Sequence, residues 1–330
     1  MFKKLLKSNE ILLMILIIGL SILFGFINPS FLTIGNCFNI LRACLVLSIF
    51  GIGVLFVTIS GGIDVSFMAI AAFSMYVTTK VFIALQWTGS ITIMFIVSTL
   101  IGILLGLVNA FFITRFKLPS FIVTLGTQNL FRGVLLALVG TMFLVNVPKS
   151  MITFSQAQLF IIKNSDGSTS GLHIGVLIVI VLYILATMLL KYTMLGRCMY
   201  AIGGDIVAAK RVGINVNLIL GFVYGATGAL AGFAGLMHTA LFRMSVPSDL
   251  VGNELTVIAA VVLGGANMAE GKGTTFGALL GILLITIISN SLTLLKIPSY
   301  WQQVVMGVII IVGTSIQSYN QKKKIKGIAL

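Results

Sequence analysis

Long apolar runs, separated by short polar or glycine-rich breaks, follow one another along all 330 residues of the chain. A helix needs about 20 predominantly apolar residues to cross a bilayer, and runs of roughly this length recur here. They fall at residues 11–27, 39–59, 65–85, 91–113, 119–140, 172–192, 218–240, 254–268, 274–295 and 300–318. Because 254–268 is short and 119–140 is interrupted, we expect some helices to be short or broken. The pattern predicts an all-α polytopic membrane protein with about ten transmembrane helices.

Composition supports this prediction. Hydrophobic residues make up 58% of the chain and charged residues 8%, whereas soluble domains carry about 25% charged residues. The net charge of +14 would suggest a nucleic-acid partner in a soluble protein. In a membrane protein the excess of Lys and Arg is expected in cytoplasmic loops, so we predict no nucleic-acid partner.

The distribution of basic residues predicts the orientation. Loops on one side of the predicted bundle collect most of them, including Lys3, Lys4 and Lys7 at the start and Lys322, Lys323, Lys324 and Lys326 at the end. This bias predicts that both termini are cytoplasmic. It makes residues 1–330 a single transmembrane domain with an external loop at 141–171 and a cytoplasmic segment at 193–217.

A glycine-rich loop near the C-terminus, GGANMAEGKG at residues 264–273, invites comparison with a phosphate-binding loop. That motif reads G-x-x-x-x-G-K-[ST], with the lysine on the phosphates and the hydroxyl on magnesium. Gly271 and Lys272 fit, but Ala266 replaces the first glycine and Gly273 replaces the hydroxyl residue. We therefore interpret Gly264, Gly265, Gly271 and Lys272 as a tight turn between membrane helices. Lys272 would anchor the topology.

The cytoplasmic segment 193–217 is too polar to span the membrane and too apolar to be disordered. Gly203 and Gly204 break the incoming chain, and Asp205 can cap the next helix. The following residues, IVAAKRV, predict a short amphipathic helix that ends at Gly213, a natural C-cap residue. Its small face could enter a groove on a partner protein. Alternatively, the helix could lie on the inner leaflet with its basic pair on lipid phosphates, which would make membrane lipid the partner.

Several stretches together resemble a known family. They are FLTIGNCFNILR, VTISGGIDVSFMAIAAF, LPSFIVTLGTQNLFRGV, LGRCMYAIGGDIVAAKRVGINVN, GALAGFAGLMH, IAAVVLGGANMAEGKGTTFGALLG and PSYWQQVVMGVIII. In order and spacing they resemble the permease subunits of bacterial ABC sugar importers, most of all the ribose-type family that includes the autoinducer-2 permeases. Ala208, Ala209 and Gly213 resemble the A-A-x-x-x-G part of the coupling motif. Val207 stands where a glutamate often precedes the alanines, and the later Leu-Pro is missing.

The resemblance implies a permease dimer in the bacterial inner membrane, with two cytoplasmic ATPase subunits and an extracytoplasmic solute-binding protein. ATP would be bound by the partner, so this chain would carry no catalytic residues, no cofactor and no metal. The ATPase contact would be made by Gly203, Gly204, Asp205, Ala208, Ala209, Arg211 and Gly213. The transported solute, whether ribose, another pentose or hexose, or autoinducer-2, is left open. The choice between a homodimer and a heterodimer is open as well.

Polar residues within the membrane segments allow two interpretations. Gly61, Gly62 and Asp64 either break and N-cap the helix at 65–85 or mark a broken helix along a polar path. Neutral groups suit a hydroxylated solute, but the same groups can join helices by hydrogen bonds. The candidate path residues are Asn109, Thr124, Gln128, Asn129 and Asn290. We interpret His238, Arg243, Asp249 and Glu254 as docking residues of the outer surface.

Two rival functions compete with an ABC permease. A self-sufficient secondary transporter or channel for a small polar solute is the main alternative, although proton-coupled transporters usually carry acids inside the membrane. Here Asp64 and Glu254 lie only at the ends of membrane segments. A membrane enzyme would need a catalytic constellation, and the isolated His173 and His238 supply none.

Overall fold

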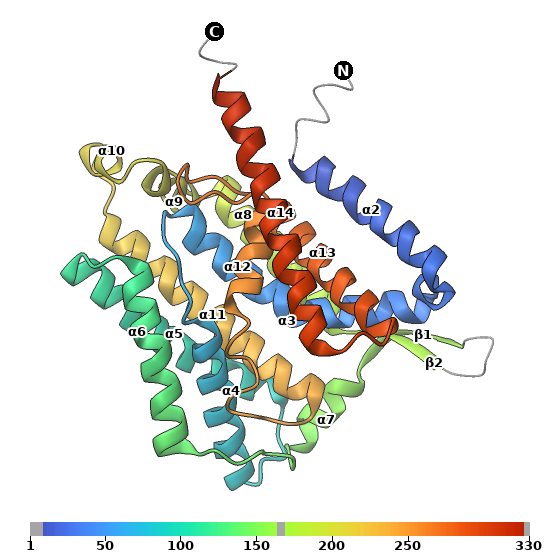
Figure 1. Ribbon diagram of the computed structural model, residues 1–330. Helices are drawn as coiled ribbons and strands as arrows, with labels where there is room; N and C mark the ends of the chain where they lie inside the picture. Colours follow the sequence, from blue (N-terminus) through green and yellow to red (C-terminus); the bar gives the residue numbers. More distant parts are fainter. Residues whose placement is uncertain (1–8, 164–168, 327–330) are drawn as a thin grey trace.

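The computed structural model describes residues 9–163 and 169–326 (Figure 1). The first half comprises α2 (Asn9–Ile27), η1 (Pro29–Leu32), α3 (Ile34–Ile59), α4 (Phe67–Ala84), α5 (Ile91–Phe116), α6 (Ser120–Val134), η2 (Leu135–Val139) and α7 (Lys149–Gln156). The second half comprises β1 (Gln158–Lys163), β2 (Thr169–His173), α8 (Gly175–Tyr192), α9 (Met194–Gly204), α10 (Ile206–Arg211), α11 (Val216–Phe242), α12 (Glu254–Leu263), α13 (Thr275–Leu294) and α14 (Ser299–Lys326).

The predicted all-α polytopic architecture is confirmed. Within residues 9–163 and 169–326, eight helices are long and apolar enough to cross a membrane. The short segment at 254–268 forms only the ten-residue α12, and the interrupted segment at 119–140 forms α6 followed by the π-helical turn η2. The orientation stays a prediction, and Lys3, Lys4 and Lys7 lie outside the described residues.

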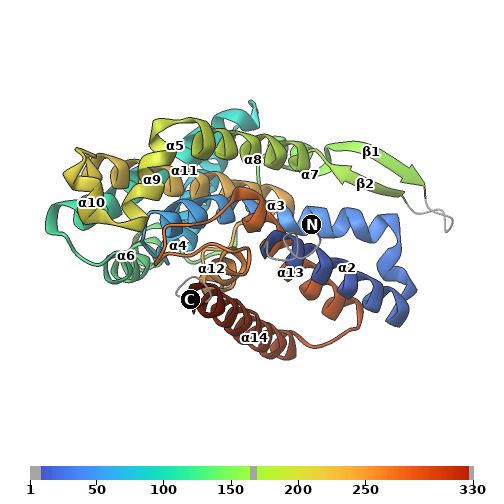
Figure 2. The same ribbon diagram turned by 90° about the horizontal axis from the view of Figure 1, so that it is seen from above.

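Helix α3 lies at the centre of the bundle. Its sequence is apolar around most of its circumference, which is typical of a helix buried on all sides. Figures 1 and 2 show it between α8 and α11 on one side and α13 on the other. The main hydrophobic core surrounds α3 and includes Ile49, Leu55, Ile70 and Leu236, which are fully or almost fully buried.

Helices α5 and α11 touch along two pairs of glycines. Gly102 and Gly106 of α5 meet Gly228 and Gly232 of α11, and the backbones approach so closely that a Cβ at any of the four would overlap the opposite carbonyl group. Small residues at such spacing allow helices to pack without the driving force that water provides in soluble proteins. The small-residue run GATGALAGFAG of α11 is therefore a packing surface.

The predicted external loop at 141–171 contains more structure than the sequence pattern indicated. It holds α7 and an antiparallel hairpin in which Ile161 pairs with Gly171 and Lys163 with Thr169. Strand β2 lies against α3, and the hairpin runs out to the edge of the molecule (Figure 2). Residues 164–168 of the serine- and glycine-rich stretch lie outside the described residues.

Candidate coupling site

Helix α10 is capped at both ends as its sequence predicts. The Asp205 carboxylate accepts hydrogen bonds from the backbone N–H groups of Val207, at 2.8 Å, and Ala208, at 3.0 Å. These bonds satisfy two donors that have no partner inside the helix. At the other end Gly213 has φ +85°, and its N–H donates to Lys210 O. The left-handed backbone favours glycine and closes the helix.

The exposed face of α10 differs in part from the predicted contact. Ala208 and Arg211 are exposed, but Ala209 is 2% exposed and packs toward the bundle. The exposed apolar residues are Ile206, Val207 and Val212. Which residues of so short a helix face inward depends on how α9 and α11 hold it. The sequence alone does not show this. Ala209 therefore fixes α10 to the bundle, and Val207 and Val212 extend the surface that a partner can reach.

Three glycine-rich stretches meet at the coupling segment. Gly203 of α9 lies between Gly61, which follows α3, and Gly271, which precedes α13. A Cβ at Gly203 would overlap the carbonyl oxygen of Ile59 and lie 2.9 Å from Gly271 Cα. Gly61 and Gly271 both have positive φ, at +80° and +57°. We call these three residues the glycine junction. It couples the backbone of α9 directly to the turns that start α4 and α13.

The loop that resembles a phosphate-binding site forms a tight turn. Asn267 and Lys272 exchange two backbone hydrogen bonds of 2.7 and 3.0 Å, so these amides are already occupied. The Lys272 ammonium donates to the Glu270 carboxylate at 2.7 Å. Tyr200 of α9 donates its hydroxyl to Gly273 O and fastens the turn to the coupling segment. This arrangement supports the interpretation as a structural turn.

A buried polar network lies beside the junction. Asp64 is 3% exposed and accepts bonds from both the N–H and the hydroxyl of Ser66, each at 2.7 Å. Asn109 of α5 donates to Ser66 Oγ at 2.7 Å and accepts from the Thr127 hydroxyl at 2.6 Å. Thr124 bonds to the backbone of the same irregular stretch, at Ile63 O and Val65 N. This stretch is not helical, and protein side chains satisfy its polar groups as burial requires.

The start of α4 differs slightly from the sequence prediction. Helix α4 begins at Phe67, later than the predicted 65, and its N-cap residue is Ser66. The Asp64 carboxylate accepts bonds from the N–H and the hydroxyl of this residue and so holds the start of α4 in place. The backbone between α3 and α4 is irregular and covered by protein, and a polar path along it stays a prediction.

The five candidate path residues do not form one group. Asn109 and Thr124 are fully buried in the network. Gln128 donates to the Glu254 carboxylate at 2.8 Å, and Asn129 donates to Leu125 O of its own helix. Asn290 lies elsewhere and donates to Asn36. In a single copy of the chain Asn129 bonds within its own helix and the other four join different elements, and a solute path along them stays a prediction.

Asn109→Ala tests the role of the network. We expect this variant to unfold at a lower temperature in detergent, with a loss of about 1–3 kcal/mol, because the Thr127 hydroxyl and Ser66 lose a buried partner. Asn129→Ala is the matched control and should change stability by less than about 0.5 kcal/mol, because Asn129 is exposed. A solute path along α5 and α6 instead predicts that both variants lose uptake while keeping their stability.

The outer-surface residues also separate. His238 pairs with Asp249 at 2.8 Å, and Arg243 donates to Ser155. Glu254 is 5% exposed and bound by Gln128 and the Gly252 N–H, so it is not a surface docking residue in this chain.

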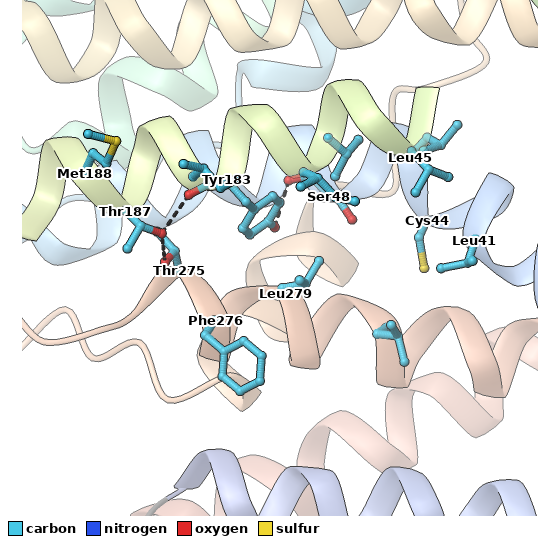
Figure 3. Close-up of a pocket in the computed structure, with 15 residues that line it drawn as sticks. Leu41, Cys44, Leu45, Ser48, Tyr183, Thr187, Met188, Thr275, Phe276 and Leu279 are labelled. Atoms are coloured by element: carbon cyan, nitrogen blue, oxygen red, sulfur yellow. Dashed lines mark hydrogen bonds between the residues drawn. The ribbon is translucent and has the colours of Figure 1, made fainter. Parts of the chain in front are cut away.

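An apolar groove of about 450 Å³ lies between α3, α8 and α13 (Figure 3). Its few hydroxyl groups mostly bond to one another or to the backbone. Tyr183 donates to Ser48 O at 3.0 Å, and the Thr187 and Thr275 hydroxyls are 2.6 Å apart. The rest of the lining is aliphatic, aromatic or, at Cys44 and Met188, sulfur-containing, so the groove offers a hydroxylated solute few hydrogen-bond partners.

The sequence of this chain is similar to those of known permeases. A family model described as the permease component of branched-chain amino acid transport systems matches residues 36–313. The ribose import permease protein RbsC of Haemophilus influenzae is 34% identical over 306 residues, covering 91% of this chain and 90% of its own length. RbsC of Bacillus subtilis is also 34% identical, covering 91% and 88%.

The xylose transport system permease protein XylH of Haemophilus influenzae is 31% identical and covers 98% of this chain and 100% of its own length. No solved structure shows a significant match. The similarity to the permeases spans the coupling segment, the glycine junction and nearly all membrane helices. The chain therefore belongs to this family of transport-system permease components, together with the ribose and xylose permeases that it resembles.

Proposed function

We propose that this permease moves a simple neutral sugar, a ribose-like pentose or a hexose, into the cell with energy from ATP hydrolysed on a partner subunit. The observation that carries the proposal is similarity to ribose and xylose permeases over more than nine-tenths of the chain. The family model is named for amino acid transport, but these relatives of similar length favour a sugar. Autoinducer-2 is the competing substrate.

The proposed assembly contains a cytoplasmic ATPase subunit, a solute-binding protein and a second permease copy. The exposed surface of α10 supports an ATPase contact, because Ile206, Val207 and Val212 present apolar side chains beside Arg211. An apolar centre and arginine side chains are typical of protein–protein contacts. The glycine junction would then pass a movement of α9 and α10 to the membrane helices. ATP would be bound by the partner and not by the turn at Lys272.

Co-purification and uptake test the proposal together. The tagged chain is purified from native membranes in mild detergent, and its companions are identified by mass spectrometry. We expect an ATPase subunit, and reconstituted vesicles should take up radiolabelled D-ribose or D-xylose only with ATP and the binding protein. Uptake driven by an ion gradient in a preparation of this chain alone would contradict the proposal. If autoinducer-2 but not other sugars competed with the labelled sugar for uptake, autoinducer-2 would be assigned as the substrate.

Val207→Asp tests the contact surface on α10. Val207 is 55% exposed, so the substitution leaves the fold intact but places an unpaired charge in the interface. We expect the ATPase to bind at least about tenfold more weakly in a pull-down titration, since burying such a charge costs more than about 1.4 kcal/mol. Leu118→Asp, which adds the same charge on the neighbouring α5–α6 connection, should bind normally. Equal loss in both variants would argue against docking through α10.

A further inference from the structure

A polar pocket of about 640 Å³ lies at the far end of the bundle from the coupling site. Helix α11 starts beside α10 and runs for 27 residues, about 40 Å, before it reaches this pocket. The start of α3, the end of α11 and the loop before α12 form its walls. Six polar side chains line it: Asn39, Arg42, His238, Arg243, Asp249 and Asn253.

Some of these side chains are held in place by the protein. His238 Nε2 and Asp249 Oδ2 are 2.8 Å apart, and Arg243 Nε donates to Ser155 Oγ at 2.8 Å. Arg42 donates to the carbonyl oxygen of Leu241 at 3.3 Å. These bonds fix the carboxylate and the two guanidinium groups without using all their hydrogen-bonding capacity, because an arginine carries five N–H donors and a carboxylate accepts about four bonds.

Neither of the two asparagines caps a helix with its side chain. Asn253 occupies the N-cap position of α12, yet its side chain makes no capping hydrogen bond. Asn39 is exposed near the start of α3. Each amide can both donate and accept, and together with Asp249 and Arg42 they surround the same space from three parts of the chain.

We propose that this pocket binds a neutral polyhydroxylated solute, so that the permease contacts its cargo directly at this end. Neighbouring hydroxyl groups of a sugar both donate and accept, which matches amide, carboxylate and guanidinium groups set side by side. The Phe242 ring, 64% exposed and beside His238, offers an apolar surface for the C–H face of a sugar ring. The Asp249 carboxylate offsets one of the two guanidinium charges of Arg42 and Arg243, and ribose 5-phosphate therefore serves below as the anionic competitor. The pocket size is also that of a small-molecule site.

This inference rests on the proposed sugar transport, and one double variant separates the two. In the reconstituted complex, Asn39→Ala combined with Asn253→Ala removes two ligand amides that hold no helix cap. We expect maximal D-ribose uptake to fall about tenfold while binding-protein affinity and complex assembly stay unchanged. Ser248→Ala, on the same loop but outside the lining, should transport like the natural chain.

Saturation-transfer NMR supplies a second measurement on the permease complex without the binding protein. D-Ribose should show contact signals with the natural chain and lose them in the double variant, and ribose 5-phosphate should not displace it.

Normal uptake and normal ribose signals in the double variant would overturn the inference alone. Weaker binding-protein association with unchanged ribose signals would make the pocket a docking surface. Displacement by the phosphate would make it an anion site. Absence of any sugar uptake by the natural complex would instead refute the proposed function.

Discussion

Gly203→Ala is expected to abolish most ATP-driven uptake while the chain still inserts into the membrane. The added Cβ would overlap the Ile59 carbonyl oxygen and press on Gly271, and neither is a side-chain end that can rotate away. The backbone of α9 must therefore move. Overpacking of this kind costs about 1–3 kcal/mol, enough for about a tenfold loss if the displaced junction no longer transmits movement. Radiolabelled sugar uptake in vesicles, normalised to inserted protein, measures the effect.

Gly204→Ala is the matched control, one residue further along the same helix. A Cβ there meets only Glu270 O at 4.0 Å, so the junction is undisturbed. Gly204 is exposed and is one of the predicted ATPase contacts, but one small methyl group leaves that contact in place, so uptake should stay near normal. The ATPase should remain bound in both variants, because α10 and its Asp205 cap are unchanged. Equal uptake by the two variants would show that close packing at Gly203 has no role in transport. Loss of the ATPase from Gly203→Ala alone would place the effect in assembly.

Gly228→Ala is expected to destabilise the membrane bundle itself. The new methyl group would overlap Gly102 O on α5 and lie 3.0 Å from Gly106 Cα, at the closest contact between two long helices. We expect a loss of about 1–3 kcal/mol, seen as a lower unfolding temperature in detergent and a smaller yield of inserted protein. Fluorescence-detected size exclusion after heating measures both quantities.

Gly221→Ala provides the comparison on the same helix. No atom lies within 4 Å of a Cβ at this position, so the variant should be as stable as the natural chain or slightly more stable. If both variants lost the same amount of stability, helix flexibility and not the α5–α11 contact would explain the glycines of α11.

The junction gives the proposed transport cycle a physical connection. Backbone contacts at Gly61, Gly203 and Gly271 leave no compressible side chain between the coupling segment and the turns. Through Gly61, a displacement of α9 reaches the irregular stretch held by Ser120, Thr124 and Asn109. Through Gly271 it reaches α13. Packed elements of this kind move between discrete arrangements more readily than they deform.

The sequence by itself determined the features that depend on local pattern. Apolar run length predicted the membrane helices and the short segment at 254–268, because hydrophobic thickness sets a minimum length. Asp205 and Gly213 predicted the ends of α10, because capping needs only neighbouring residues. The sequence also predicted that the loop at residues 264–273 is a turn, because Ala266 and Gly273 replace residues that a phosphate-binding loop needs.

The tertiary structure decided which distant residues meet. Nothing in the sequence shows that Gly61, Gly203 and Gly271 share one contact, or that Asn109 bonds to Ser66 while Asn290 bonds to Asn36. The inward position of Ala209, the hairpin in the external loop and the pocket between α3 and α11 likewise depend on how the helices pack. A membrane helix is apolar on nearly every face. Its sequence pattern therefore predicts that it spans the bilayer, but not which neighbouring helix each face contacts.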